Sequence, residues 1–357
     1  MATKNSGIYE KVGWDPGNGT QKAAWINGKV TTLTLPNVAG IGGMEATGLN
    51  LAGLDSHRRQ DVPHRVEFGG VSYLVGANVA SYARPIERMD TLRLVEGAEL
   101  RAMLYAVLGL LGLNGCQVGL TIGLPVELVE DKAQALALEK EMAAWVMGQH
   151  RFSLNGQEAG VEIVRMRATI AQPLGTWLDW GFNQDGQWAK GAEGRKAPAL
   201  VIDQGFHTLD LFGVEDGRPS PRFTAGERLG MARAAEMIGR SVTQRYGVEL
   251  SLHEADGLLR QQLSGEKPTI YSRGELVEVG DLVGQALNSL AAEVLQFVER
   301  VLGRSAGKFR LILSGGGALA LANRLRRQYP EAEMAPTPEV ANARGLGKLA
   351  ASGYLDR

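Results

Sequence analysis

The stretch Leu200-Val201-Ile202-Asp203-Gln204-Gly205-Phe206-His207-Thr208-Leu209-Asp210 decides how this chain is interpreted. A short apolar run ends in an Asp and a Gly turn, and a Thr and a second Asp follow on returning apolar sequence. Val12-Gly13-Trp14-Asp15-Pro16-Gly17-Asn18-Gly19-Thr20-Gln21-Lys22 has nearly the same layout near the N-terminus. Two such Asp-x-Gly hairpins predict two carboxylates and two sets of turn amides that converge on one phosphate chain. The sequence therefore predicts a nucleotide site between two similar halves.

The bulk properties of the chain predict a soluble protein of two or three domains, and its 47 glycines, which fall at the ends of predicted strands, suit an α/β fold. It has 357 residues, 44% of them apolar and 22% charged, so buried cores are expected. The formal net charge of −1 gives no electrostatic reason for direct binding to nucleic acid or to a membrane. Cys116 is the only cysteine, which excludes an intrachain disulfide and fits a reducing cytoplasm. The polar N-terminus lacks the apolar core of a signal peptide, and we therefore expect a cytoplasmic protein.

Apolar periodicity and turn residues predict a repeated order of elements in the two halves. In the first half we expect strand 10–15, its return at 22–25, a type I′ turn at Asn27-Gly28, strand 29–35, an irregular insertion at 36–90 with one hairpin, helix 98–111, strand 118–122, helix 127–147, strand 161–166 and a bridging helix within 168–178. In the second half we expect a boundary or exposed hairpin at 181–198, strands 199–203 and 208–214, a turn at Asp216-Gly217, a third strand at 222–224, helix 227–246, strand 309–313, and a final helix with Thr337 as N-cap and Pro338 as its first residue.

Each Asp-x-Gly turn can serve a phosphate in two ways. Its small residues expose backbone N–H groups to anionic oxygens, and its Asp can hold Mg²⁺, mainly through water. Asp15 and Asp203 are therefore the predicted metal-binding carboxylates, and Lys22 follows the first turn where an ammonium could reach a phosphate. A single such motif is more often only a structural turn, but two in the same arrangement favour a site. The turn residues expected to bind nucleotide are Gly17, Asn18, Gly19, Gly205, Phe206, His207 and Thr208.

A late triple glycine, Gly315-Gly316-Gly317, follows the strand predicted at 309–313. Glycines at such a junction can exist only for close packing, or their bare backbone can let an adenosine lie flat against the chain. Glu227 and Arg228, which open the predicted helix 227–246, are candidates to hydrogen-bond the purine or ribose, and Gly226 is counted with them among the nucleotide-binding residues. A solvated helix start is the competing interpretation of Glu227.

The order of these motifs resembles the superfamily of actin, sugar kinases and DnaK-type chaperones. Asp15-x-Gly17-x-Gly19 with Lys22, then Gln172, then Asp203-x-Gly205-x-x-Thr208-x-Asp210, and finally Ser314-Gly315-Gly316-Gly317 carry the resemblance. Within the superfamily the chain most resembles the prokaryotic actin-like ATPases, namely the ParM/StbA plasmid-segregation proteins and the archaeal actin-like proteins. The segment Ala341-Asn342-Ala343-Arg344-Gly345 and the short insertion at 36–90 support that assignment.

The resemblance implies two RNase H-like domains with ATP and Mg²⁺ in the cleft between them. Domain I is expected at 8–172 plus 336–357, with 36–90 as a small inserted subdomain, and domain II at 173–335. It further implies head-to-tail filaments, a role in plasmid or DNA segregation or another cytoskeletal role, and DNA contact through an adaptor protein. His207 departs from the small or polar residue common in the family at that position.

Gln172 bears on the type of reaction, and with Asp15 and Asp203 it completes the predicted catalytic set. A kinase of this superfamily needs a carboxylate to deprotonate its acceptor hydroxyl, whereas a Gln can only orient a water molecule. Between Ala168 and Trp180 the only acid is Asp179. Slow ATP hydrolysis is therefore favoured, with a small-molecule kinase and a monomeric chaperone-like ATP switch as alternatives. Gln172 as a mere helix cap also remains open.

Overall fold

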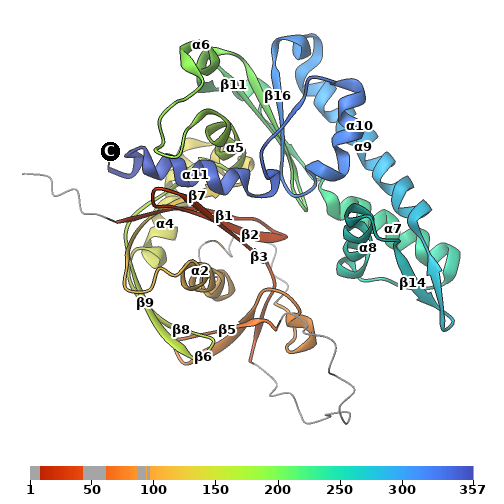
Figure 1. Cartoon of the computed structure of the whole chain (residues 1–357), viewed down its shortest axis with the longest axis horizontal. Coiled ribbons are helices and arrows are strands. Elements are labelled where there is room, and N and C mark those ends of the chain that lie inside the picture. The colour runs from red at the N-terminus through yellow and green to blue at the C-terminus, as the bar shows by residue number, and fades with distance from the viewer. Residues whose placement is uncertain (1–8, 43–61, 87–93, 95–96, 357) are drawn as a thin grey trace, which may run out of the picture.

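The computed structural model of the chain describes residues 9–42, 62–86, 94 and 97–356 (Figure 1). Residue 8, where the first domain was expected to begin, residues 43–61 and 87–90 of the predicted insertion, and residue 357 lie outside the described residues. Within the described ranges, no helix is long and apolar enough to cross a membrane.

A mixed nine-stranded sheet forms the first half of the molecule. Its strands β1 and β7 run parallel, and their central residues are buried on both faces because their side chains are almost all apolar. Strand β1 pairs antiparallel with β2 across the first Asp-x-Gly turn, which sets Asp15 opposite Lys22. In spatial order the strands are β3 (Val30–Pro36), β2 (Thr20–Ile26), β1 (Glu10–Pro16), β7 (Gln117–Leu124), β9 (Gln157–Ala171), β8 (Gly148–Leu154), β5 (His64–Phe68), β6 (Val71–Val75) and β4 (Ala39–Ile41).

The described part of the predicted insertion extends this sheet. The expected hairpin is confirmed as β5 and β6, whose turn residues Gly69 and Gly70 have φ of 56° and 77°. Strand β5 also pairs with β8, which is the antiparallel partner of the long strand β9. Strand β8 was not predicted. It joins the insertion to the central strands, so the two build one continuous sheet.

A second sheet repeats the arrangement of the first. Strand β10 pairs antiparallel with β11 across the second Asp-x-Gly turn, with Asp203 opposite Asp210, and parallel with β16. These relations match those of β1 with β2 and with β7, so the predicted duplication is confirmed. The strands are β12 (Arg218–Pro219), β11 (Leu209–Glu215), β10 (Ala199–Gln204), β16 (Arg310–Ser314) and β17 (Glu333–Met334), with β13 (Ala225–Glu227) also paired to β11.

Helices cover both sheets, and their apolar stripes form the cores. In the first half, α2 (Ala98–Leu110) is enclosed by the curved sheet (Figure 1), and its predicted stripe, which includes Leu100, Met103, Leu104 and Leu108, is buried. The other helical segments of that half are η1 (Val79–Ser81), α3 (Val126–Val129), α4 (Lys132–Val146) and, after the second half, α11 (Ala341–Ala351) and η5 (Tyr354–Asp356).

The second half carries four longer helices and a small hairpin at its far end. The long α9 (Gly280–Leu302) crosses α7, and Figure 1 places the hairpin at the end of the molecule away from the two large sheets. The helical segments are α5 (Gln172–Gly181), α6 (Gly191–Lys196), η2 (Pro221–Phe223), α7 (Met231–Tyr246), α8 (Leu252–Ser264), α9, η3 (Gly303–Lys308), α10 (Ala318–Gln328) and η4 (Pro338–Val340), and the hairpin is β14 (Thr269–Ser272) with β15 (Glu275–Glu278).

Helices α5 and α11 approach each other closely at the junction of the two halves. A Cβ on Gly345 would overlap the carbonyl oxygen of Gly175, and a Cβ on Gly175 would overlap the carbonyl of Asn342. Only glycine at both positions permits this distance between the helix backbones. The C-terminal helix therefore lies directly against the segment that connects the halves.

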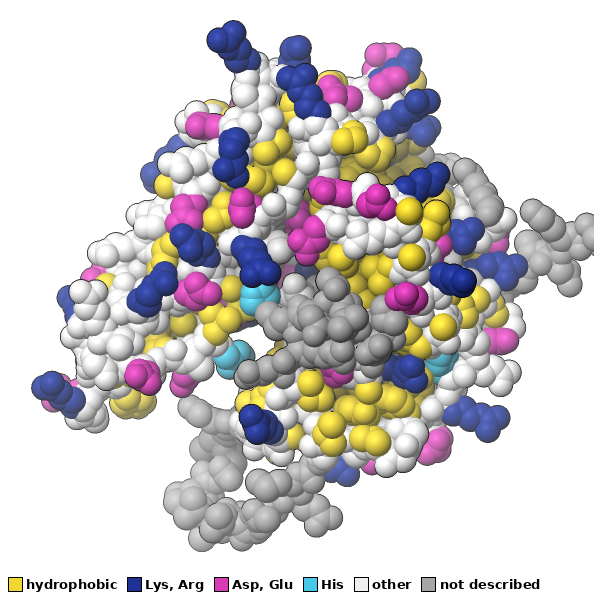
Figure 2. Space-filling view, turned by 180° about the vertical axis from the view of Figure 1, so that it is seen from behind, with side chains coloured by type: hydrophobic (Ala, Val, Ile, Leu, Met, Phe, Trp, Pro, Cys, Tyr) yellow, Lys and Arg dark blue, Asp and Glu magenta, His cyan; other side chains and the backbone are white. Residues whose placement is uncertain are grey.

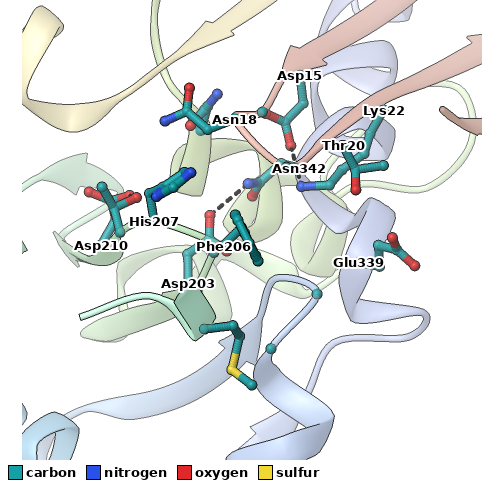
Figure 3. Close-up of a pocket in the computed structure, with 18 of the residues that line it drawn as sticks. Asp15, Asn18, Thr20, Lys22, Asp203, Phe206, His207, Asp210, Glu339 and Asn342 are labelled. Atoms are coloured by element: carbon teal, nitrogen blue, oxygen red, sulfur yellow. Dashed lines mark hydrogen bonds and ion pairs between the residues drawn. The ribbon is translucent and has the colours of Figure 1, made fainter. Parts of the chain in front are cut away.

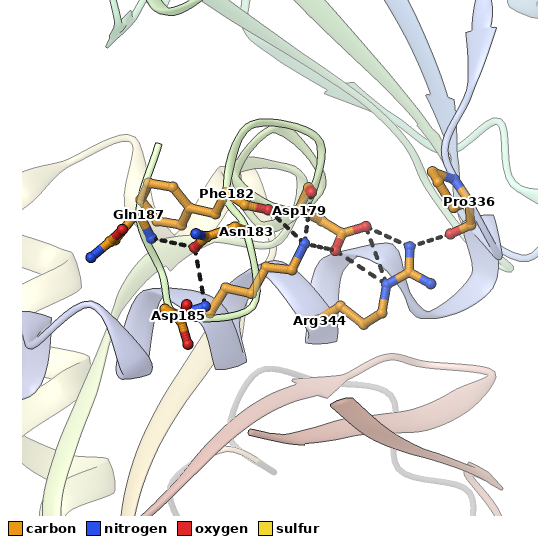
Figure 4. A network of polar contacts seen from close by, with 8 residues as sticks. Asp179, Phe182, Asn183, Asp185, Gln187, Pro336 and Arg344 are labelled. Atoms are coloured by element: carbon orange, nitrogen blue, oxygen red, sulfur yellow. Dashed lines mark hydrogen bonds and ion pairs between the residues drawn. The ribbon is translucent and has the colours of Figure 1, made fainter. Parts of the chain in front are cut away.

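An ion cluster holds the same two helices together (Figure 4). The carboxylate of Asp179 on α5 accepts hydrogen bonds from the Arg344 guanidinium at 2.5 to 3.2 Å and lies 2.9 Å from the Lys348 ammonium. Arg344 also donates to the carbonyl of Pro336, and Lys348 donates to the carbonyls of Asp179 and Phe182. Because these charges are nearly buried and mutually satisfied, the cluster fixes the angle between the helices.

Several predicted elements differ from the structure for local reasons. The helix expected at 127–147 is split, because the Asp131 side chain accepts from the Gln134 amide and begins α4 anew. The strand expected at 161–166 runs on to Ala171, so the bridging helix begins only at Gln172. The turn at Asn27-Gly28 is not type I′, because Ile26 pairs with Val30 across a three-residue loop in which only Gly28 has a positive φ.

The remaining differences lie in the second half. Pro221 begins a 3-10 turn at the place of the strand expected at 222–224, and β13 forms immediately after it. Helix α7 therefore starts at Met231. Thr337 does not cap the last helix with its side chain: it adopts φ 45° before a 3-10 turn, and α11 begins at Ala341.

The glycine contact between α5 and α11 gives a stability prediction. Gly345→Ala should lower the free energy of unfolding by about 1–3 kcal/mol, because the added methyl group meets backbone that cannot move aside. Gly284→Ala in α9 is the matched control, since a Cβ there meets nothing within 4 Å and should stabilise the helix by about 0.5–1 kcal/mol. Urea denaturation measures both. An equal effect of the two substitutions would contradict the close helix contact.

Candidate functional site

The two Asp-x-Gly turns face each other across a cleft between the two halves (Figure 3). Gly19 of the first turn lies against the second turn, because a Cβ on Gly19 would be only 2.8 Å from the Cβ of Phe206. The turns that the sequence suggested as partners are thus brought together. The predicted residues that line the cleft are Asp15, Gly17, Asn18, Gly19, Lys22, Gln172, Asp203, Gly205, Phe206, His207, Thr208, Gly316 and Gly317.

Lys22, Asp15 and Asp203 form the charged centre of the cleft. The Lys22 Nζ is 3.4 Å from Asp15 Oδ2, and their side chains are 12% and 2% exposed. Burial alone would lower the pKa of Lys22, but the charges of Asp15 and Asp203 outweigh it and leave that pKa raised. Burial also raises the pKa of Asp203, while Lys22 and a hydrogen bond from Asn342 oppose the rise. Two carboxylates beside one ammonium leave an excess of negative charge that another cation would offset.

Asn342 on the C-terminal helix connects this centre to the junction of the two halves. Its Nδ2 donates to Asp203 Oδ2 at 2.7 Å, and its Oδ1 accepts from the Thr176 hydroxyl at 2.7 Å. Thr176 is fully buried and Asn342 is 5% exposed. The sequence offered Asn342 only as part of a segment supporting the family resemblance, and its contact with Asp203 appears only in three dimensions.

The second turn is braced from two sides. The Met231 amide donates to the Gly205 carbonyl at 3.1 Å and the Ala232 amide donates to the Phe206 carbonyl at 2.7 Å, so the turn covers the first amides of α7. The Thr208 hydroxyl donates to Asp210 Oδ2 at 2.9 Å. Burial, and then the charge of Asp203, raises the pKa of Asp210 to about 7. The turn is therefore held in shape by contacts of its own.

Three predicted site residues do not line the cleft. Gly226 and Glu227 belong to β13, where they pair with Asp210 and Leu209, and they do not begin a helix. Gly315 has φ 85°, and a Cβ there would overlap the Gln204 carbonyl and the Asp203 carboxylate. Gly315 is thus required for close packing, and so is Gly317, where a Cβ would lie 2.6 Å from the side chains of Gln204 and Met231; Gly316 and Gly317 also line the cleft. The triple glycine divides between the two interpretations that the sequence left open.

The cleft also contains side chains that sequence reasoning missed. Glu127 lies just after Pro125, at the end of β7, and a rule was available to find it: the carboxyl ends of neighbouring parallel strands meet at one edge of a sheet. Asp179, the only acid considered near Gln172, is instead bound in the ion cluster of α5 and α11. No local signal distinguished the other missed residues, which are Pro16, Thr20, Pro125, Met231, Asp256, Leu259, Arg260, Leu263 and Glu339.

The donor set fits a hydrated Mg²⁺ ion. Within the described ranges, no group of three or more His, Cys, Asp or Glu side chains is placed to hold a metal by itself. Mg²⁺ commonly binds through one or two carboxylates, several waters and the phosphates of a substrate. Asp15 and Asp203 supply such a pair, and their excess negative charge favours a divalent cation.

Comparisons with known proteins agree with this geometry. Residues 13–175 match the family model for the N-terminal domain of actin-like proteins, and residues 201–327 match the model for the C-terminal part of the MreB-like archaeal actin homologue. No curated protein sequence matches the chain.

Solved structures of the same architecture cover nearly the whole chain. The archaeal actin homologue Ta0583 has a TM-score of 0.73 and 17% identity, and the match covers 95% of this chain and 98% of that one. A ParM from a Clostridium botulinum filament has a TM-score of 0.72 and 19% identity, and the match covers 96% of this chain and 99% of that one. The psk41 ParM has a TM-score of 0.68 and 17% identity, and the match covers 98% of this chain and 99% of that one. The fold is therefore the two-domain actin fold.

Asn342 gives a prediction about the polar junction. Asn342→Ala should lower the free energy of unfolding by about 1–3 kcal/mol, because Asp203 and Thr176 then lose a partner in a buried site. Asn288→Ala is the control, since that side chain forms an exposed hydrogen bond with Arg324 and should change stability by no more than about 0.5 kcal/mol. Chemical denaturation compares the two, and equal small effects would show that the junction adds no stability.

Proposed function

Because the chain belongs to the prokaryotic and archaeal actin-like proteins, we propose that it binds ATP with Mg²⁺ in the cleft, hydrolyses ATP slowly and assembles into head-to-tail filaments. The meeting of the two Asp-x-Gly turns around Lys22, Asp15 and Asp203 carries the proposal. Ta0583 has been solved in complex with ADP, and the Clostridium botulinum ParM forms a 15-stranded filament. These relatives support nucleotide binding and self-assembly for this chain.

We assign the phosphates of ATP to the two turns. Lys22 is a buried cation with a raised pKa, so it stays protonated and can bind a phosphate oxygen by a charge-assisted hydrogen bond. Asp15 and Asp203 would hold Mg²⁺, mainly through water, and bound Mg²⁺ neutralises charge on the phosphate oxygens. The backbone at Gly316, where a Cβ would meet only Glu339 at 4.0 Å, lets a flat ring system approach, and Met231 packs against the neighbouring Gly317.

Gln172 and Glu127 are the proposed groups for hydrolysis. Both line the cleft, and each follows the end of one of the adjacent parallel strands β9 and β7 of the first sheet. The Gln172 amide orients the attacking water, and the Glu127 carboxylate accepts the proton that the water loses. Because a Gln cannot accept a proton at neutral pH, assigning proton transfer to Glu127 and water orientation to Gln172 gives each side chain a role that it can perform.

Glu127 also supports a second candidate function, that of a small-molecule kinase. A small-molecule kinase needs a carboxylate in the cleft for its acceptor hydroxyl, and Glu127 satisfies that requirement. The two functions differ in the acceptor of the phosphoryl group, which is water in one case and a hydroxyl compound in the other. They differ also in assembly, which only the filament protein requires.

The cellular role is proposed from the family alone. Plasmid or DNA segregation in the cytoplasm, with DNA held through a separate adaptor protein, agrees with a net charge of −1, which gives no support to direct nucleic-acid binding. The charge of this chain therefore favours an adaptor over a direct contact.

The proposal predicts that hydrolysis and assembly share one critical concentration. Phosphate release and light scattering, measured together with Mg-ATP over a series of protein concentrations, should both rise above the same threshold. Asp203→Ala should abolish hydrolysis while the circular dichroism spectrum stays unchanged, because a metal-binding carboxylate is removed. Hydrolysis linear in protein with no scattering would contradict assembly, and phosphate transfer to an added hydroxyl compound would favour the kinase.

Gln172 and Glu127 should respond differently to substitution. Glu127→Gln should slow hydrolysis about 100-fold through loss of the proton acceptor. Gln172→Ala should slow it about tenfold through a poorly oriented water, with longer-lived filaments. Nucleotide affinity should be retained in both variants. Glu130→Gln, outside the cleft on the same segment, is the control and should hydrolyse ATP at the wild-type rate. A wild-type rate in Glu127→Gln would exclude it as the base.

A further inference from the structure

The β14–β15 hairpin carries an exposed apolar pair at one end of the molecule (Figure 1). Tyr271 and Leu276 are 73% and 60% exposed, and they are direct cross-strand neighbours on one face. The opposite face is used by the chain itself, because Ile270 and Val277 pack against the core of the second half. Hairpin strands present alternate residues to opposite faces, so Tyr271 and Leu276 form one outward surface.

A hollow of about 550 Å³ lies at the other end of the same half, between α6 and the turn that joins β11 to β12. Its aromatic wall is Trp188, whose indole N–H donates to the Gly191 carbonyl at 2.9 Å and whose ring packs against Trp177 and Trp180. These contacts hold the indole in place before any partner arrives. Fixed Trp, Tyr and Arg side chains are the residues that carry most binding energy in protein interfaces.

The charges around the two surfaces are complementary. The hollow is lined by three basic side chains, Arg195, Lys196 and Arg218, and by one acid, Asp216. Within the part of the chain that the structure describes, none of the three bases forms an ion pair.

The hairpin has the opposite balance. It carries Glu275 and Glu278, and Glu266 just before it, against Lys267 and Arg273. Lys267 is already paired with Glu278 at 2.9 Å. In the space-filling view, Lys and Arg side chains stand along the upper end of the molecule, where Figure 1 places α6, while the hairpin end lies at the lower left (Figure 2). An aromatic projection with an excess of one acid thus lies opposite a Trp-walled hollow with an excess of two bases.

We propose that the outward face of the β14–β15 hairpin of one copy docks in the Trp188–Arg195–Arg218 hollow of the next copy. The inference rests on the proposed self-assembly and specifies its contact. The two surfaces differ and lie at opposite ends, so the contact is heterologous and repeats without closing. Tyr271 and Leu276 supply the apolar contact, and Glu278, which shares their face of the hairpin, supplies the acidic group for the basic rim. Such an arrangement gives a polar filament from one kind of interface.

The test uses one variant for each side of the contact. The hairpin variant is Tyr271→Asp with Leu276→Asp, and the hollow variant is Arg195→Glu with Arg218→Glu. Sedimentation with Mg-ATP should show a critical concentration raised about tenfold or more in each, because hot-spot contacts are lost. Leu136→Asp on α4, 50% exposed and in the other half, is the control and should assemble as the wild type does. All three should keep wild-type nucleotide affinity.

A mixture of the two variants decides the direction of the contact. The hollow variant keeps an intact hairpin and the hairpin variant keeps an intact hollow, so a 1:1 mixture should form heterodimers in analytical ultracentrifugation and no filaments. A mixture that stays monomeric would overturn the hairpin-to-hollow contact. Wild-type assembly by either variant, or loss of assembly in Leu136→Asp as well, would also overturn it while the proposed self-assembly stands. Absence of assembly by the wild-type chain would overturn the proposed function, and the contact with it.

Discussion

The approach of helix α5 to helix α11 is the constraint on which the rest of this structure depends. Gly175 and Gly345 let the two backbones meet, and the buried cluster of Asp179, Arg344 and Lys348 fixes their crossing. Since α5 leads from the first sheet into the second, this contact brings the C-terminal helix back between the halves. Asn342 can then reach Asp203 in the second sheet. Asn342 and Asp203 are far apart in the sequence, and only the packing of α11 against α5 brings them together.

The electrostatics of the cleft follow from that closure. Each half contributes one Asp at the carboxyl end of a buried strand, and the single ammonium of Lys22 lies beside both. Two carboxylates in a poorly hydrated site are costly without a cation, and burial raises the pKa of Asp203 for this reason. A site of this kind favours a divalent ion and an anionic ligand that arrive together. This charge balance is the physical basis for the proposal that Mg²⁺ and ATP bind here together.

The same architecture separates the cleft from the two surfaces that are proposed to join copies. The cleft lies between the halves, whereas the hairpin β14–β15 and the hollow beside α6 lie at opposite ends of the second half. Both surfaces belong to the second half, so a change in the angle between the halves at α5 and α11 leaves their placement relative to each other unchanged.

The sequence by itself determined the repeated strand–turn–strand units, the two Asp-x-Gly turns, Lys22, Gln172 and the α/β class, because these depend on local turn chemistry and on apolar periodicity. It misplaced Gly226 and Glu227, because a Pro-initiated turn moved the start of α7, and it could not show that strand β8 joins the insertion to the central sheet. Only the tertiary structure decided that Glu127 enters the cleft, that Asp179 belongs to a buried ion cluster and that Asn342 binds Asp203. These contacts join segments far apart in the chain, and their partners are set by sheet order and helix packing, which no local pattern of residues encodes.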